Sequence, residues 1–173
     1  MRINQFYMET SQNMAKYQGL KTAGKEIELK YLGVYVLTVT DNSTFKGILN
    51  IADTVTAVND KTFESSKEMV DYVNSQTLGD KVKVTYQEDG KVKTAEGKII
   101  TLENGKNGIG IGLIDRTEVS SDVPIKFSTA GIGGPSAGLM FSLSIYTQIA
   151  DPTLRNGRII AGTGSIDRDG NVG

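Results

Sequence analysis

One serine of the chain lies in a glycine-framed run, Gly134-Pro135-Ser136-Ala137-Gly138, which follows two further glycines at 131 and 133. Glycines permit backbone conformations that a β-carbon would block, and Pro135 suits the first position of a helix. Ser136 would then lie in the first helical turn, near the positive end of the helix dipole. This arrangement is typical of a mounted serine nucleophile, and equally of a small residue that fits a helix start.

Two missing residue types restrict the chemistry that this serine can do. The sequence contains no histidine and no cysteine, which excludes a Ser-His-Asp triad, a thiol nucleophile and the common zinc sites. If Ser136 is a nucleophile, its base must be a lysine, a carboxylate or an α-amine, and lysine is the best-attested partner. We expect no metal and no cofactor.

Charge and glycine spacing exclude other classes of partner. With 19 basic and 20 acidic residues the net charge is −1. The sequence has no block of basic residues of the kind that binds nucleic acid, so nucleic acid is not an expected partner. No apolar run is long enough to span a membrane. The spacing Gly108-x-Gly110-x-Gly112, in a stretch that we interpret as a joint with a short glycine-broken strand, is not a dinucleotide fingerprint. The sequence also lacks the Gly-Lys-Ser/Thr of a phosphate-binding loop.

The elements that would hold Ser136 come from both ends of the chain. Residues 137–150 are apolar almost all round, which predicts a buried helix. We expect strands at residues 123–127 and 158–162 and a hairpin turn at 167–171. Residues 6–20 predict a further helix that packs through an imperfect apolar stripe and ends near Gly24.

The middle of the chain alternates short strands and helices. Strands are expected at residues 32–37 and 54–58, and the alternation of Val82, Val84 and Tyr86 predicts a half-buried strand that turns back at Asp89-Gly90. A short helix is expected at residues 44–49. The capping box Ser65-Ser66-Lys67-Glu68 predicts the start of a longer helix that Gly79 ends.

This order of elements, over residues 30–113, resembles a PDZ domain of the bacterial protease-associated kind. The resemblance implies a carboxylate-binding loop at Leu32-Gly33-Val34-Tyr35, with a peptide added as a strand beside residues 34–38. The helix 66–75, through Met69 and Val70, would form the other wall. Asp60 and Ala52 stand where the family usually has glycine. The alternative is a small αβ module without a ligand.

The C-terminal part resembles the proteolytic domain of Lon-type serine peptidases, on the run 134–138 followed by Arg158-Ile159-Ile160-Ala161-Gly162-Thr163-Gly164-Ser165. The resemblance implies that Ser136 is the nucleophile, that Gly134 belongs to the oxyanion region, and that Thr163 contacts a catalytic lysine. The backbone N–H groups of Ser136 and a neighbouring glycine are the oxyanion donors that we expect. That lysine would follow residues 170–173, and no lysine in this sequence matches it.

Gly133 replaces the aspartate of most Lon enzymes, as in the subgroup that joins a PDZ domain to a Lon-like domain. Members of that subgroup, the streptococcal pheromone-processing type among them, are ATP-independent and usually tethered at the outer face of the bacterial membrane. The resemblance therefore implies a membrane tether in the full-length protein, outside this chain, and leaves oligomerisation open.

Together these interpretations predict an α+β protein with an N-terminal helical segment at 1–29, a PDZ domain at 30–115 and the first part of a Lon-like domain at 121–173. The expected function is serine endopeptidase activity by a Ser-Lys dyad on peptide or protein substrates, with the PDZ domain recruiting or gating them. Because the lysine is missing, we expect this fragment to be inactive. The alternative is a non-catalytic PDZ module that binds peptides as a scaffold.

Overall fold

The computed structural model describes residues 2–129 and 134–173, and Gly131 and Gly133 of the predicted glycine turn lie outside these ranges. The chain divides into two units, each described here by itself. The sheet unit comprises residues 31–116, and the helical unit comprises residues 1–30 and 117–173.

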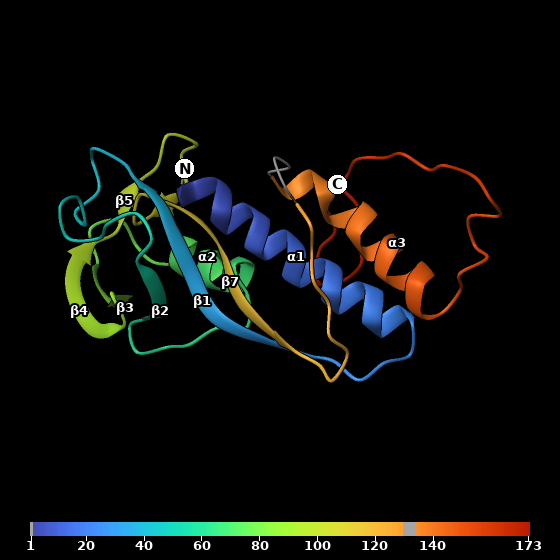
Figure 1. Ribbon diagram of the computed structural model, residues 1–173. Helices are drawn as coiled ribbons and strands as arrows, with labels where there is room; N and C mark the ends of the chain where they lie inside the picture. Colours follow the sequence, from blue (N-terminus) through green and yellow to red (C-terminus); the bar gives the residue numbers. More distant parts are fainter. Residues whose placement is uncertain (1, 130–133) are drawn as a thin grey trace. The chain divides into compact units, whose positions relative to one another are not determined.

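The sheet unit is built on a five-stranded sheet with strand order β4-β3-β2-β1-β7, so β1 is an interior strand and β7 an edge strand (Figure 1). β5 and β6 form a separate two-stranded ribbon. The elements are β1 (Glu28–Val39), β2 (Thr54–Val58), α2 (Ser66–Asn74), β3 (Lys81–Glu88), β4 (Lys91–Lys98), β5 (Ile100–Thr101), β6 (Asn107–Gly108) and β7 (Ile111–Ser120).

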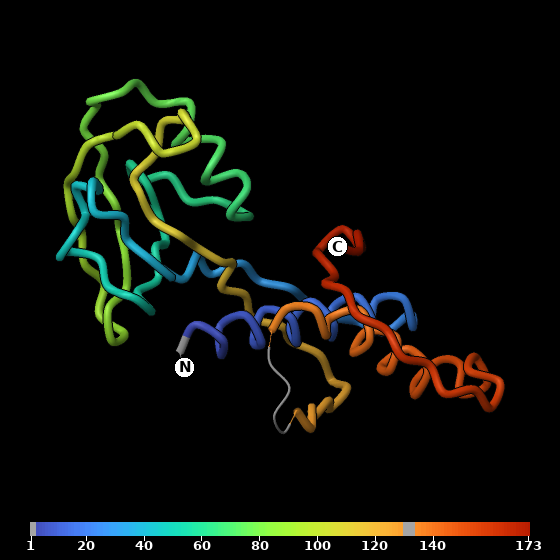
Figure 2. The backbone as a smooth tube through the Cα atoms, turned by 90° about the horizontal axis from the view of Figure 1, so that it is seen from above, coloured from blue at the N-terminus to red at the C-terminus, as the bar shows by residue number. Residues whose placement is uncertain are grey.

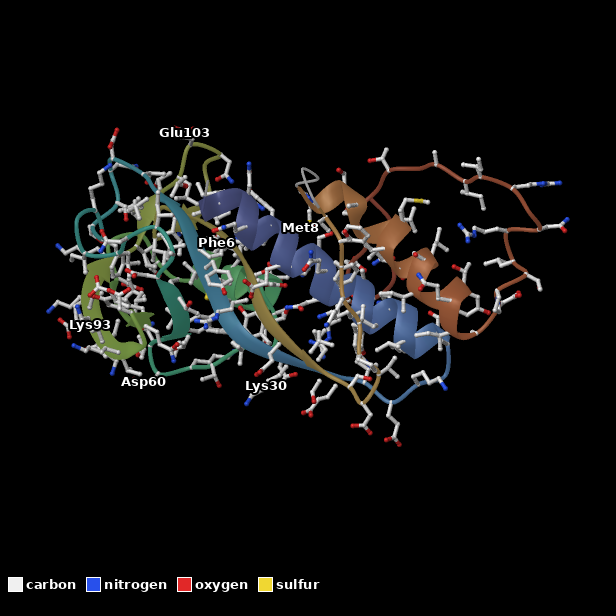
Figure 3. The ribbon with its side chains drawn as sticks, in the orientation of Figure 1. Phe6, Met8, Lys30, Asp60, Lys93 and Glu103 are labelled. Carbon is white, nitrogen blue, oxygen red and sulfur yellow. The ribbon has the colours of Figure 1, made fainter. Side chains whose placement is uncertain are left out.

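The core of the sheet unit follows the predicted alternation along β3. Val82, Val84 and Tyr86 are buried, whereas Lys93 on the neighbouring strand β4 is exposed and projects outward (Figure 3). Burying such apolar side chains is the main favourable contribution to folding. The core comprises Val34, Val36, Phe45, Leu49, Val55, Val58, Phe63, Met69, Val73, Val82, Val84, Tyr86, Ile99 and Ile109.

The predicted start of α2 is confirmed. Ser65 is the N-cap, and its hydroxyl accepts a hydrogen bond from the N–H of Glu68 at 3.2 Å. The carboxylate of Glu68 accepts from the N–H of Glu64 at 2.9 Å, one residue earlier than in the usual capping box. The helix ends at Asn74, before Gly79.

The predicted helix at residues 44–49 is wrong. The segment folds as consecutive turns. The hydroxyl of Ser43 accepts from the N–H of Phe45 at 3.1 Å, as an N-cap would, and donates to the carbonyl of Ile109 at 2.6 Å. Gly47, with φ of 77°, then interrupts any continuation.

The helical unit consists of α1 (Arg2–Thr22), the short 3₁₀ helix η1 (Pro135–Ala137) and α3 (Gly138–Ile149). Both helices were predicted, and α1 extends beyond the expected residues 6–20. α3, which was expected to be buried almost all round, is buried on one side only, and its Leu143 is 39% exposed. α1 and α3 lie side by side (Figure 2). A β-carbon on Gly19 of α1 would lie 2.8 Å from the side chain of Ile145 on α3, so glycine allows the two helices to approach closely.

Two strands predicted for the helical unit are absent from the described residues. Residues 123–127 are extended, and the alternating side chains of Val123, Ile125 and Phe127 pack on the core of this unit rather than entering a sheet. Residues 158–162 are exposed and irregular. A strand needs a partner strand for its backbone hydrogen bonds. Neither of these two segments has a partner strand among the described residues.

The glycine at position 33 should be indispensable for the sheet. Gly33 has φ of 127°, and a β-carbon there would lie 2.2 Å from the carbonyl oxygen of Val55. We predict that Gly33→Ala lowers the free energy of unfolding by roughly 2–4 kcal/mol, through left-handed strain and steric overlap. Gly90→Ala is the matched control, because Gly90 has φ of 78° with open space around it, and should cost only about 1 kcal/mol. Urea unfolding measures both, and equal losses would contradict the steric argument.

Candidate functional site

An apolar groove lies between α2 and the edge strand β7. Its cavity has a volume of about 140 Å³. The helix contributes Met69, Val70, Val73 and Asn74, and the other wall is formed by Leu102, Gly108, Ile109, Gly110, Ile111 and Leu113. Met69, Val73 and Ile109 are buried at its base. The groove therefore combines an apolar floor with the free backbone edge of β7.

The backbone at the start of β7 is fixed from one side. The carbonyl of Ile109 accepts from the hydroxyl of Ser43 at 2.6 Å, and the carbonyl of Gly110 accepts from the N–H of Thr40 at 2.8 Å. Within the described chain, no acceptor is assigned to the N–H groups of Ile109 and Gly110. Gly110 has φ of 72°, a conformation that brings successive N–H groups into an anion-binding concavity.

Glycine is required where β7 passes β1. A β-carbon on Gly110 or Gly112 would lie 2.4 Å from the hydroxyl of Thr40 or Thr38, respectively. The spacing Gly108-x-Gly110-x-Gly112 predicts a joint with a short strand, and the close packing of Gly110 and Gly112 against threonines was not predicted. The alternation of glycine with Ile109, Ile111 and Leu113 directly before a strand was the available signal.

The six residues predicted to bind peptide are divided between two places. Met69 and Val70 line the groove. Leu32, Gly33, Val34 and Tyr35 lie on β1, one strand away, where β2 and β7 occupy both edges. Val34 is fully buried. A peptide strand therefore cannot add beside Val34 without displacing β7, and the free edge belongs to β7.

Each end of the groove is tied by a hydrogen bond. The carboxylate of Asp115 on β7 accepts from the N–H of Ser66, in the first turn of α2, at 3.0 Å. The side-chain amide of Asn107 donates to the carbonyl of Gln76, just past the other end of α2, at 2.8 Å. These contacts fix the separation of the two walls.

In the helical unit, the structure brings Ser136 and Thr163 together across 27 residues of sequence. The carbonyl of Ser136 accepts from the N–H of Gly164 at 2.7 Å and from the hydroxyl of Thr163 at 3.3 Å. The carbonyl of Gly164 in turn accepts from the N–H of Leu139 at 3.0 Å. Gly134, with φ of 104°, precedes η1, and the side chains of Ser136 and Thr163 are both exposed.

No general base faces Ser136 among the described contacts. Lys126, which the sequence places shortly before the serine, is exposed and lines a different cavity of about 320 Å³ against Phe141 and Ile145 of α3. The described residues contain no cluster of three histidine, cysteine or acidic side chains that could hold a metal. Among the described helices, none is long and apolar enough to cross a membrane.

The comparisons with known proteins identify the family. The model of the PDZ domain matches residues 5–99, more than half of the 173 residues. The chain belongs to the PDZ domain family. This PDZ protein has a mixed α+β fold, with an N-terminal helix and a PDZ-like sheet with helices. These findings show a PDZ domain and do not show a Lon-like domain.

Solved PDZ domains are similar to part of this PDZ chain. The PDZ domain of an SdrC-like protein from Listeria monocytogenes is 35% identical, covers 50% of this chain and 93% of its own, and superposes with a TM-score of 0.47. That of an SdrC-like protein from Listeria innocua is 38% identical, covers 47% and 92%, and has a TM-score of 0.45. No curated protein matches the chain.

The hydroxyl of Tyr31 in the PDZ sheet gives a test of the packing near Asp115. Its oxygen is buried and has no hydrogen-bond partner in the described chain. The pKa of Tyr31 is raised, mainly because the hydroxyl is buried and to a smaller extent because the carboxylates of Asp115 and Glu68 are near. We predict that Tyr31→Phe is neutral or stabilises the fold by up to about 1 kcal/mol. In the control Tyr72→Phe, the lost hydroxyl accepts from the side-chain amide of Asn59 at 3.2 Å, so stability should fall. Urea unfolding compares them, and a destabilised Tyr31→Phe would mean that the hydroxyl has a partner.

Proposed function

We propose that the chain binds peptides in the groove between α2 and β7. The unpaired edge of β7, facing a helix across an apolar floor, is the observation that carries this proposal. A bound peptide would extend the sheet as a further strand, with main-chain hydrogen bonds to β7. PDZ domains generally bind peptides or proteins, and this is the geometry that strand addition requires.

The chemistry at the end of the peptide that meets Ile109 and Gly110 follows from the same geometry. A terminal carboxylate, or a carbonyl at a turn, would accept from the N–H groups of Ile109 and Gly110, whose carbonyls already have donors. The apolar side chain next to it would enter the cavity over Met69 and Val73. The preferred ligand is therefore a peptide with an aliphatic residue beside its carboxylate or turn.

Val70 gives the sharpest test of this groove, because it lines the cavity and is only half-buried. We predict that Val70→Lys weakens binding of a short fluorescent peptide with an aliphatic C-terminal residue by roughly tenfold or more, since a charged side chain would enter an apolar wall. Val92→Lys is the control: Val92 is 66% exposed on β4, away from the groove. Fluorescence anisotropy measures both affinities, and an unchanged affinity for Val70→Lys would place the ligand elsewhere.

We propose further that the chain belongs to a serine endopeptidase that uses a Ser-Lys dyad. The hydrogen bonds from Thr163 and Gly164 to the carbonyl of Ser136 favour this second function. They bring into contact the runs 134–138 and 158–165, on which the Lon resemblance rests. The lysine is expected in the sequence that follows residues 170–173. As in the resemblance, Thr163 would lie beside its amine, and the PDZ groove would recruit or gate the substrate.

The reaction divides into two steps. A neutral lysine amine takes the proton of the Ser136 hydroxyl as its oxygen attacks the peptide carbonyl, and the amine side of the peptide leaves with that proton. Water then hydrolyses the acyl-enzyme and regenerates the serine. Lowering a lysine pKa from about 10.4 to about 7–8 requires roughly 4 kcal/mol of differential stabilisation, which burial supplies.

The surroundings proposed for this enzyme follow from the same resemblance. We place the full-length protein at the outer face of a bacterial membrane, held by a tether outside residues 1–173, and acting without ATP. Its substrates would be peptides or proteins, and it would need no metal or cofactor.

Replacing the nucleophile tests the enzymatic proposal in the natural protein that carries the expected lysine. We predict that Ser136→Ala lowers kcat for a peptide that this protein cleaves by a factor on the order of 10³ or more, while peptide binding in the groove is retained. Ser144→Ala, at an exposed serine of α3, is the control and should leave cleavage unchanged. Mass spectrometry of the products follows the reaction. If the longer protein binds peptides yet cleaves none, the scaffold alternative holds instead.

A further inference from the structure

Helix α1 carries buried polar side chains that donate to loop carbonyls in the helical unit. Ser11 is 5% exposed and its hydroxyl donates to the carbonyl of Pro135 at 3.3 Å. Gln18, two turns further along, is 7% exposed and its amide donates to the carbonyl of Asp167 at 2.9 Å and to that of Arg168 at 2.6 Å. One face of α1 thus holds both the serine turn and the hairpin turn.

The contact of Ser11 acts on a single peptide unit. The carbonyl of Pro135 and the N–H of Ser136 belong to the same planar group, so fixing the direction of the oxygen fixes the direction of the N–H. The carbonyl of Pro135 also accepts from the N–H of Gly138, and the next carbonyl, that of Ser136, accepts from Gly164. Within the described chain, no acceptor is assigned to the Ser136 N–H.

The close packing around Gly138 shows why Ser11 reaches this peptide unit. A β-carbon on Gly138 would lie 3.1 Å from the hydroxyl oxygen of Ser11 and 3.3 Å from the backbone nitrogen of Ile166. α1, α3 and the segment after Thr163 therefore meet at this glycine. A β-carbon at position 138 would require the Ser11 hydroxyl to shift by a few tenths of an ångström.

We propose that Ser11 is a positioning residue for the oxyanion-binding N–H of Ser136. This inference rests on the proposed peptidase function. The hydroxyl of Ser11 orients the peptide unit and, by donating to its oxygen, polarises the N–H toward the charge that develops on the attacked carbonyl. At 3.3 Å the bond is a modest one, so its effect is a fraction of that of an oxyanion donor itself.

The test compares Ser11→Ala with wild type in the natural protein that carries the expected lysine. We expect kcat to fall roughly fivefold, the effect of one ordinary hydrogen bond, with an unchanged KM and an unchanged pH profile because the base is untouched. A peptide boronate, which places an oxygen anion at the same N–H groups, should bind roughly fivefold more weakly, while an uncleaved peptide binds as before.

The control is Ser142→Ala. Ser142 is also a buried serine of the helical unit, on α3, and lies outside the hydrogen bonds described for the serine turn, so the loss of its hydroxyl should leave kcat and boronate binding unchanged. In the 173-residue chain, Ser11→Ala should also shift the amide resonance of Ser136, which Ser142→Ala should not. Wild-type kcat and boronate affinity in Ser11→Ala, while Ser136→Ala abolishes cleavage, would overturn the positioning role alone. Full activity of Ser136→Ala would overturn the peptidase proposal itself.

Discussion

The sheet unit depends on a pairing between distant strands, β1 and β7. This pairing makes β1 an interior strand and turns β7 into the edge that faces α2. It requires glycine at position 112, where a β-carbon would overlap the hydroxyl of Thr38 on β1, and at position 110, where it would overlap the hydroxyl of Thr40 just after β1. The same strand also supplies Asp115, whose carboxylate accepts from the first turn of α2. The strand β7 therefore provides the free edge of the groove and also sets the width of the groove.

A comparable long-range constraint acts on the serine turn of the helical unit. The carbonyls on both sides of the Ser136 N–H are held, one by Ser11 and Gly138 and the other by Thr163 and Gly164. A residue at a short 3₁₀ start would otherwise have few contacts to fix its backbone. Preorganised N–H groups contribute to catalysis only when they need no reorganisation during the reaction. The hydrogen bonds thus fix the orientation of the backbone at Ser136, which the flexible glycines alone cannot do.

Elements with strong local signals could be predicted from the sequence, whereas long-range pairings could not. The cap at Ser65, the alternation along β3 and the turn at Asp89-Gly90 are written in neighbouring residues, and each was predicted correctly. Two of the six expected groove residues, Met69 and Val70, line the groove, because they lie on the helix whose start the cap at Ser65 predicts. The other four lie on β1, which is covered by β7, a strand that follows more than seventy residues later and has no local signal at residues 32–35. Residues 123–127 were predicted as an edge strand, but their alternating apolar side chains pack on the core of the helical unit, and local sequence does not distinguish these two partners.

Binding and cleavage make different demands on this chain, and they are therefore separable. Adding a peptide strand to β7 uses backbone groups and an apolar floor that lie wholly within the sheet unit. The proposed cleavage would need a nucleophile, an oxyanion donor and a base, and the hydrogen bonds to the carbonyls of Pro135 and Ser136 hold the backbone around the proposed nucleophile. A base becomes effective only when its amine is desolvated beside the serine. Because the side chains of Ser136 and Thr163 are exposed, an element that brought a lysine to them in the proposed peptidase would also have to cover them. We therefore expect the base and the burial that lowers its pKa to come from the same segment of chain.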